Sequence, residues 1–511
     1  MNGAREGAGG WRGGHAARRA LLVVGVWSAV GSAQVAPPAA PALLQLSYPA
    51  VPGRTLVVSA GGNLQAALDS AQRGDEVVLA AGATFTGNFV LKPKSGTVAN
   101  GWVVVRSSQL GQLPAGVRVG PAQAGLMARV QTANNMAALA TAAGASGWWV
   151  AGVEVGVAPA LAVLNNGLVL LGDGSSAQNS LSQVASYLVL DRVYVHASAT
   201  QETKRCVALN SAASEVRDSY LYDCHANGMD TQAIAGWNGP GPYRIVNNML
   251  AGAGENVIFG GADPAIAGLV PSDIEVRRNY LYTPATWKGV WQKKNLLELK
   301  NARRVLVEGN VLDGVWVDGQ VGFAVLLKSV NQSGGCVWCR VTDVALRGNL
   351  IRNFAGGINL AGLPQGPTDT TTRRIAIVGN VLEGLAYPGN GNLLQLLSNG
   401  RDLAIDSLVA NGGTAANMLL ALDVAPAWTN FAFTNVVATP GAYGIKASGY
   451  AVGEASLGVV AGTVDYRNVY LIGAPRGGWP RSRFVADARG VVLDGVIRAR
   501  VAAATAGVAV R

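Results

Sequence analysis

The 511-residue chain lacks the long apolar runs of a membrane protein and the aromatic bulk of a wide globular core. It has 8 phenylalanines, and 14% of its residues are charged. The one membrane-like segment, Ala20–Gly31, is shorter than the roughly 20 apolar residues that a spanning helix needs. The 67 glycines and many small apolar residues favour a narrow stacked core with tight turns. The sequence therefore predicts no transmembrane span.

Histidine and cysteine are also scarce, which bears on metal sites and disulfides. The chain has 3 histidines and 4 cysteines. Cys336 and Cys339 have redox or zinc spacing, but no second cysteine or histidine pair accompanies them, so a structural zinc site is not expected. A local disulfide and two free thiols are the alternatives. Cys206 and Cys224 lie 18 residues apart, and whether they are bonded stays open.

The N-terminus has the pattern of a secretory signal peptide. Arg18 and Arg19 precede the apolar segment, and Gly31-Ser32-Ala33 is a small-x-small cleavage pattern. We expect residues 1–33 to be removed, with a buried helix as the alternative. Residues 34–54 are rich in proline and alanine and are interpreted as a linker. The mature protein is then secreted, either extracellular or periplasmic.

A short phrase recurs five times, each copy with an asparagine between two apolar residues. The asparagines lie 31, 31, 39 and 31 residues apart, and a period of this length indicates a solenoid. Each phrase alternates apolar and polar residues, as a half-buried strand does. Stacked asparagines can bond to one another in an amide ladder, so the repeat predicts a parallel β-helix. The structural ladder residues are Asn248, Asn279, Asn310, Asn349 and Asn380.

Segments on both sides of the ladder fit the same register, with other residues in the asparagine slot. Val153, Val193 and Ser219 precede the ladder. The residues that follow it are Leu408, Val436, Val469 and Val496. This register gives about twelve coils in a β-helix domain over residues 55–500, followed by an alanine-rich tail at 501–511. The later coils carry aliphatic residues in the slot, so the middle of the array is chemically distinct.

An amphipathic helix is predicted over residues 63–72, with Asn63 as N-cap. It would cover the open end of the core. This helix, the Gly74-Asp75-Glu76-Val77-Val78-Leu79 sequence and the asparagine coils resemble the right-handed parallel β-helix (pectate-lyase-like) superfamily over residues 55–500. The resemblance implies an all-β, right-handed solenoid of about twelve coils with a short N-terminal capping α-helix, and it assigns no subfamily.

Each middle coil has a second strand after the asparagine phrase, and four of these strands can be overlaid. They begin at Val257, Leu297, Val325 and Ile358. Alternate residues of a strand point to opposite faces, so the first and third residues of each strand point inward. The side chains that then point outward together are Glu298, Lys300, Lys328 and Asn359.

This outward column suits a polysaccharide lyase, which needs a base and a cation beside a uronate carboxylate. In that hypothesis Lys300 or Lys328 is the base, and Glu298 orients the substrate or holds Ca²⁺. Two carboxylates could instead serve a glycoside hydrolase. A third alternative is a solvated face of paired charges with no function.

Residues upstream on the same sheet and in the adjoining loops complete the candidate site. A possible Ca²⁺ site, the one cofactor considered, comprises Asp230, Glu255 and Asn256. Tryptophan rings stack on sugars, and Trp237 and Trp316 lie in neighbouring loops. The substrate-binding candidates are Trp287, Trp291, Asn359, Gln232 and His225.

Around Glu255, the sequence Gly254-Glu255-Asn256 is similar to the Gly-Glu region of the alginate- and chondroitin-cleaving lyases of the superfamily. The second acidic residue and the arginine of that region are absent, so the resemblance transfers no catalytic residue. We expect an exported, monomeric, carbohydrate-active protein, leaning to a lyase for uronate-containing glycans. The net charge of +10 favours an acidic polymer as partner, and the predicted export favours polysaccharide over nucleic acid. The alternative is a non-catalytic glycan-binding, adhesion or structural solenoid at the cell surface.

Overall fold

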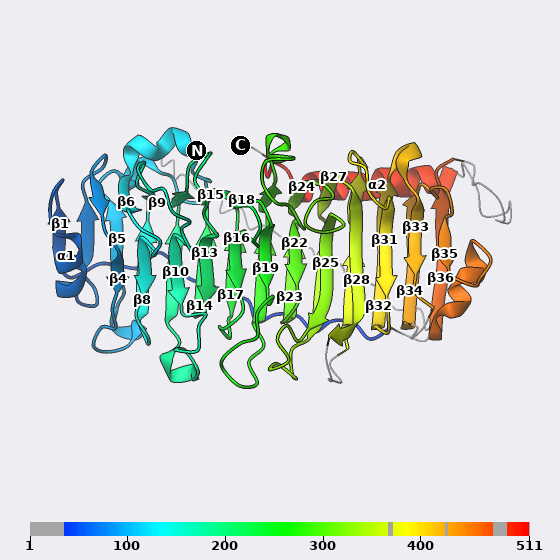
Figure 1. Cartoon of the computed structure of the whole chain (residues 1–511), viewed down its shortest axis with the longest axis horizontal. Helices are drawn as coiled ribbons and strands as arrows, with labels where there is room; N and C mark the ends of the chain where they lie inside the picture. The colour runs from blue at the N-terminus through cyan, green and yellow to red at the C-terminus, as the bar shows by residue number, and fades with distance from the viewer. Residues whose placement is uncertain (1–34, 366–370, 425–427, 474–487, 510–511) are drawn as a thin grey trace, which may run out of the picture. The chain divides into compact units, whose positions relative to one another are not determined.

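The structure is a computed structural model that describes residues 35–365, 371–424, 428–473 and 488–509. The predicted signal peptide lies outside the described residues. From residue 55 onward the chain runs in successive coils whose strands stack side by side on three faces (Figure 1). All pairings between the described strands are parallel.

The first face begins each coil. Its strands are β1 (Thr55–Val58), β2 (Glu76–Leu79), β5 (Val103–Ser107), β8 (Ser146–Ala151), β11 (Ser186–Asp191), β14 (Ala212–Arg217), β17 (Tyr243–Val246), β20 (Ser272–Arg277), β23 (Ala302–Glu308), β26 (Val341–Arg347) and β29 (Arg373–Val378).

The second face follows the ladder asparagine. Its strands are β3 (Thr84–Thr86), β6 (Ala128–Thr132), β9 (Val153–Val157), β12 (Tyr194–His196), β15 (Tyr220–Cys224), β18 (Met249–Gly252), β21 (Tyr280–Tyr282), β24 (Val311–Val315), β27 (Leu350–Phe354) and β30 (Val381–Glu383). Three long strands run through the corner and join the two faces into one 24-stranded sheet: β32 (Arg401–Asn411), β34 (Thr429–Ala438) and β36 (Ala461–Leu471).

The third face is a separate 12-stranded sheet. Its strands are β4 (Phe89–Leu91), β7 (Leu139–Thr141), β10 (Val169–Gly172), β13 (Arg205–Asn210), β16 (Gln232–Gly236), β19 (Glu255–Phe259), β22 (Leu297–Leu299), β25 (Phe323–Val330), β28 (Gly356–Gln365), β31 (Asn392–Leu397), β33 (Met418–Leu422) and β35 (Ile445–Ala447). Short 3₁₀ helices lie in the turns: η1 (Val98–Asn100), η2 (Leu110–Gln112), η3 (Pro121–Leu126), η4 (Leu181–Gln183), η5 (Ala285–Trp287), η6 (Gly413–Ala415) and η7 (Glu454–Val459).

The five asparagines stack at the corner between the first and second faces, where all of them are buried. Asn279 Oδ1 accepts hydrogen bonds from both the backbone N–H and Nδ2 of Asn248, each at 2.9 Å. The same pair of contacts links each asparagine to the next, through to Asn380. The residue before each asparagine is left-handed, with φ of 63° at Gly309 and 66° at Gly379, which is why glycine suits this position.

The slot continues in register beyond the ladder at Leu408, Val436 and Val469. Val496, predicted as a further slot, lies instead in helix α2 (Ala488–Ala504). The prediction is wrong because the apolar residues here follow the spacing of a helix and not that of a strand. Ile497 and Val501, four residues apart, pack on Val409 and its neighbours as one helical stripe. Figure 1 shows α2 lying across the late coils.

Helix α1 (Leu64–Ser70) lies where the sequence predicts a helix. Asn63 Oδ1 accepts from the Ala66 N–H at 3.0 Å, and Leu64 and Leu68 are buried in the main apolar cluster. That cluster runs through the coils from Val58 to Leu471. No helix among the described residues is long and apolar enough to cross a membrane.

Residues 35–53, the greater part of the predicted linker, form a strap along the first face. Ala42 N–H donates to Asp273 at 2.9 Å, and Ala39 N–H donates to Asp343 at 3.0 Å, two coils further on. Leu46 O accepts from Arg217 at 3.3 Å. The strap therefore runs opposite to the direction in which the coils stack.

Both cysteine pairs form disulfides. Cys206 and Cys224 join β13 to β15 inside the core, with their Cα atoms 5.6 Å apart. Cys336 and Cys339 close a short loop after β25. The structure thus contains no free cysteine.

Candidate functional site

The third face has a local rule that decides which side chains reach its outer surface. Each middle coil enters this face with two consecutive inward residues, for example Leu296 and Leu297, which are both in the core. The outward positions before and after this pair are therefore three residues apart, at Asn295 and Glu298. Regular alternation then places Lys300 outward as well.

The strand register agrees with the predicted overlay. Ile258, Glu298, Leu326 and Asn359 are successive partners across β19, β22, β25 and β28. A pocket of about 450 Å³ lies over these strands. Four predicted residues, Glu298, Lys300, Lys328 and Asn359, line it together, and Asp230 joins them at the rim.

Lys300 is held by Glu298. The Lys300 ammonium lies 2.6 Å from Glu298 Oε1, and Asn295 Nδ2 donates to Glu298 Oε2 at 2.7 Å. Burial alone lowers the pKa of Lys300, but the charge of Glu298 and its hydrogen bond outweigh burial and hold this pKa above its ordinary value. Lys300 is therefore a fixed cation in the pocket.

Lys328 lies one strand further along and behaves in the opposite way. Burial lowers its pKa, and repulsion from Lys300 lowers it further, while the more distant Glu298 opposes both. No described carboxylate lies within ion-pair distance of Lys328. The pocket thus holds two neighbouring lysines, one with a raised pKa and one with a lowered pKa.

Beneath the pocket lies a buried acid, Glu255. Gln232 Nε2 donates to Glu255 Oε2 at 2.9 Å, while Glu255 Oε1 and Gln232 Oε1 have no hydrogen-bond partner among the described residues. Burial raises the pKa of Glu255, and repulsion from Glu298 and Asp230 adds to this rise. Glu255 is therefore biased toward the protonated form.

Lys293, in the loop before β22, is fully buried next to this acid. Its Nζ donates to the Asn295 carbonyl at 2.8 Å and to Asn256 Oδ1 at 3.3 Å. Burial lowers the pKa of Lys293, and attraction to Glu255 and Glu298 only partly restores it. Two acids, Glu255 and Glu298, and two lysines, Lys293 and Lys300, therefore share one poorly solvated volume.

The three predicted metal ligands are not brought together. Asp230 forms an ion pair with Lys294 at the pocket rim. The Asn256 side chain points away and donates to the Leu250 and Tyr282 carbonyls at 2.6 and 2.8 Å. Within the described part of the chain, no group of three His, Cys, Asp or Glu side chains is arranged to hold a metal ion. Asp230, Glu255 and Asn256 therefore do not form one cluster.

Three of the predicted substrate-binding residues lie elsewhere. His225 is fully buried and stacks on Trp291, with ring centroids 4.1 Å apart, and meets Trp287 edge-on at 5.0 Å. Trp287 also packs on Tyr222 of the second face. None of the three lines the pocket, because apolar packing draws this loop onto the second face. Gln232 does not line the pocket either, and its Nε2 donates to Glu255.

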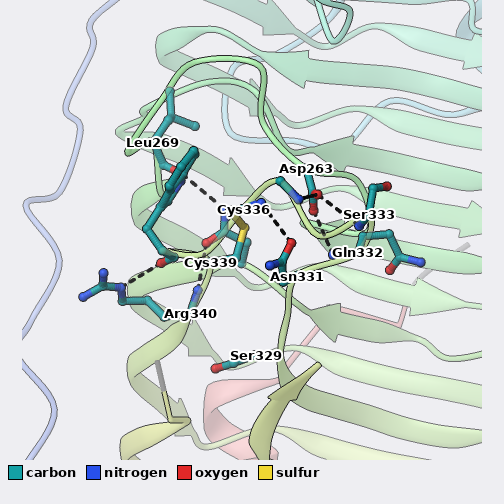
Figure 2. Close-up of a disulfide and its surroundings, with 12 residues drawn as sticks. Asp263, Leu269, Ser329, Asn331, Gln332, Ser333, Cys336, Cys339 and Arg340 are labelled. Carbon is teal, nitrogen blue, oxygen red and sulfur yellow. Dashed lines mark hydrogen bonds between the residues drawn. A yellow bond between two sulfur atoms is a disulfide. The ribbon is translucent and has the colours of Figure 1, made fainter. Parts of the chain in front are cut away.

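One wall of the pocket is a loop closed by a disulfide (Figure 2). The backbone N–H groups of Gln332, Ser333 and Gly335 donate to the Asp263 carboxylate at 2.8 to 3.0 Å, and Gln332 and Val330 line the pocket. The Cys336–Cys339 bond closes the other end of the loop. Asp263 therefore organises the wall and does not itself line the pocket.

Sequence reasoning missed Lys293, Asn295 and Gln320. A signal for Asn295 was present: Gln232, Glu255 and Asn295 each precede an outward position by three residues, as the register of β16, β19 and β22 shows. Lys293 gave no such signal, because it lies in a loop where periodicity carries no information.

No family model and no curated protein matches the sequence. Among solved structures, the catalytic domain of a GH87 α-1,3-glucanase in complex with tetrasaccharides superposes with a TM-score of 0.53, at 12% identity over 85% of this chain and 70% of that chain. The catalytic unit of a GH87 α-1,3-glucanase from Streptomyces thermodiastaticus gives 0.49, at 12% identity over 85% and 71%. A mannuronic-acid-specific polysaccharide family 6 lyase from human gut microbiota gives 0.45, at 10% identity over 81% and 91%. At these identities the likeness concerns the fold, and the predicted parallel β-helix is confirmed.

Proposed function

We propose that this protein is an exported carbohydrate-active enzyme, a lyase that cleaves a uronate-containing glycan in the pocket over β22 and β25. The observation that carries this proposal is the pair of adjacent lysines in one pocket: Lys300 lies 2.6 Å from Glu298, and Lys328 has no ion-pair partner among the described residues. Such pairs of titratable groups are typical of acid–base sites. The neighbouring folds of polysaccharide-acting enzymes are in keeping with a glycan substrate.

In this mechanism Lys300 stays protonated and neutralises the uronate carboxylate, which acidifies the adjacent carbon–hydrogen bond. Lys328, as the neutral amine, takes that proton. The electron pair of the broken bond forms a carbon–carbon double bond, the glycosidic carbon–oxygen bond breaks, and the departing oxygen takes a proton from water or from Lys328. The product is an unsaturated uronate.

Other pocket residues position the substrate. Asn359 Oδ1 is buried without a hydrogen-bond partner among the described residues, so it can accept a hydroxyl hydrogen bond. Glu298 holds Lys300 in place, and Asn295 holds Glu298. Because Lys300 supplies the positive charge, the reaction as drawn does not use Ca²⁺.

The test is to incubate the purified protein with polygalacturonate, alginate, chondroitin and hyaluronan, with and without Ca²⁺, and follow the ultraviolet absorbance of the unsaturated product. The lyase proposal predicts absorbance growth with at least one polymer. New reducing ends without absorbance would instead indicate a hydrolase. Binding with neither product would favour the non-catalytic glycan-binding solenoid.

Export and a monomeric state belong to the same proposal, and both rest on the sequence. Mass spectrometry of the secreted protein should find residues 1–33 missing. Light scattering should give the mass of one chain.

A further inference from the structure

A second concavity, of about 500 Å³, lies on the third face over β7, β10, β13 and β16. The order of strands in this sheet places it toward the N-terminal coils from the site pocket. With strands about 4.8 Å apart, the centres of the two concavities, near β13 and β25, are separated by roughly 19 Å. Both open on the outer surface of the same sheet, along the direction in which the coils stack.

The wall of this concavity is fixed by a polar network. Trp237 Nε1 donates to the Gly174 carbonyl at 2.9 Å, and Gln178 Nε2 donates to the Asn210 and Asn238 carbonyls at 2.9 and 2.7 Å. A Cβ atom on Gly174 would lie 1.9 Å from the Trp237 ring, so only glycine permits this contact. The loop is therefore set in place before any ligand arrives.

The network leaves one donor unused. Asn210 is 1% exposed, and its Oδ1 accepts from the Trp237 and Asn238 backbone N–H groups, both at 2.9 Å. Asn210 lines the concavity, and its buried Nδ2 has no hydrogen-bond partner among the described residues. A buried donor of this kind is costly unless a ligand meets it.

Arg205 provides the positive charge beside that donor. Its guanidinium lies over the Trp237 ring at 4.8 Å, and its buried Nε has no hydrogen-bond partner among the described residues. Asp173 is the one acid among the residues that line the concavity, and its Oδ1 already accepts from Ser175 N–H at 2.7 Å. The two buried atoms without a partner, Arg205 Nε and Asn210 Nδ2, are both donors, and Arg205 carries a positive charge, which matches a carboxylate.

We propose that Arg205 and Asn210 form a second subsite, which binds the carboxylate of another uronate unit of the same glycan chain. This proposal rests on the proposed function for the identity of the polymer. It does not rest on turnover, because the subsite contains neither lysine of the site pocket. A chain bound at both places would lie along the third face, parallel to the stacking direction.

The test is affinity electrophoresis in gels that contain polygalacturonate or alginate. Asn210→Asp keeps the acceptor for the Trp237 and Asn238 N–H groups and replaces the unused donor with an anion. Arg205→Met keeps apolar contact with Trp237 and removes the charge. Each variant should raise the dissociation constant for the polymer, obtained from the retardation, at least tenfold. Asn468→Asp on β36 makes the same charge change away from the third face and should bind as the wild type does.

Circular dichroism first establishes that each variant is folded. If Asn210→Asp does not fold, the binding test is made with Arg205→Met alone. Weakened binding in the folded variants, with binding by Asn468→Asp unchanged, supports the subsite. This holds even if no unsaturated product forms, because that result would overturn only the lyase proposal. Binding by both variants equal to that of the wild type overturns the subsite. If the wild type binds neither polymer, the subsite is overturned as well.

Discussion

Two charged clusters, one on the first face and one on the third, use charge in opposite ways. On the first face, Arg304 and Arg374 each form two parallel hydrogen bonds to an aspartate of the preceding coil, at 2.6 to 2.7 Å. Those aspartates, Asp273 and Asp343, also accept the N–H groups of the strap. On the third face, Glu255 and its neighbours are more deeply buried and keep unpartnered oxygens.

The difference separates structural charge from functional charge. Paired arginines and carboxylates in alternate coils fix the register of the solenoid and its strap. Buried acids and amines that lack full pairing reduce stability, and proteins retain such arrangements mainly where chemistry or binding needs them. Of the two clusters, the one on the third face lies at a pocket and is therefore the candidate site.

The largest expected effect is on turnover. Replacing Lys328 with Met should reduce the rate of unsaturated-product formation by roughly 100- to 10,000-fold, since it removes the base. The melting temperature should change little. Lys446→Met on β35 is the matched control, a lysine on the same face four strands away. Equal activity in the two variants would remove Lys328 from the mechanism.

The next effect is on stability, and its sign is unusual. Glu255→Gln should raise the free energy of unfolding by about 1–2 kcal/mol near neutral pH, because it removes a buried acid whose ionised form is disfavoured. The folded-state pKa of Glu255 lies above the unfolded value of about 4.3, so the folded protein binds more protons and loses stability as pH rises above that value. Denaturant unfolding at several pH values should show the gain growing from acid toward neutrality. A gain that stays constant with pH would contradict this assignment.

The first face should respond in the opposite direction. Asp343→Asn should lower the free energy of unfolding by about 1 kcal/mol, since it weakens the contact with Arg374 but keeps an acceptor for the strap. Burial raises the pKa of Asp343, yet the hydrogen bonds from Arg374 and the Ala39 N–H outweigh it and lower this pKa. The stabilisation is therefore present above about pH 3.9 and is lost as pH falls through the folded-state value. Parallel urea titrations of both proteins at neutral and acid pH test this sign.

The smallest effect concerns the strap alone. Ala42→Pro removes the N–H that donates to Asp273 and should lower the free energy of unfolding by about 1 kcal/mol or less. Product formation should be unchanged, because the strap lies on the first face. Loss of activity in this variant would show that the two faces are coupled.

Much of this organisation follows from periodicity. The repeat predicts which asparagines stack, and the strand overlay predicts that Glu298, Lys300, Lys328 and Asn359 form one outward column. Both inferences succeed because strand alternation and coil register are local properties repeated many times.

The loops did not follow from periodicity. Trp287 and Trp291 were predicted at the substrate, but packing on His225 and the second-face tyrosines holds them away from the pocket. The strap and helix α2 likewise depend on contacts with coils far away in sequence.

By itself the sequence determined the β-helix, its asparagine ladder and the outward column of the third face, because a side chain's face is set by its position in a repeated strand. Only the tertiary structure decided which of these groups share a buried volume, which lysine is held charged, and where the Trp-rich loop packs. Burial and electrostatic coupling arise between coils, and no single coil's sequence contains them.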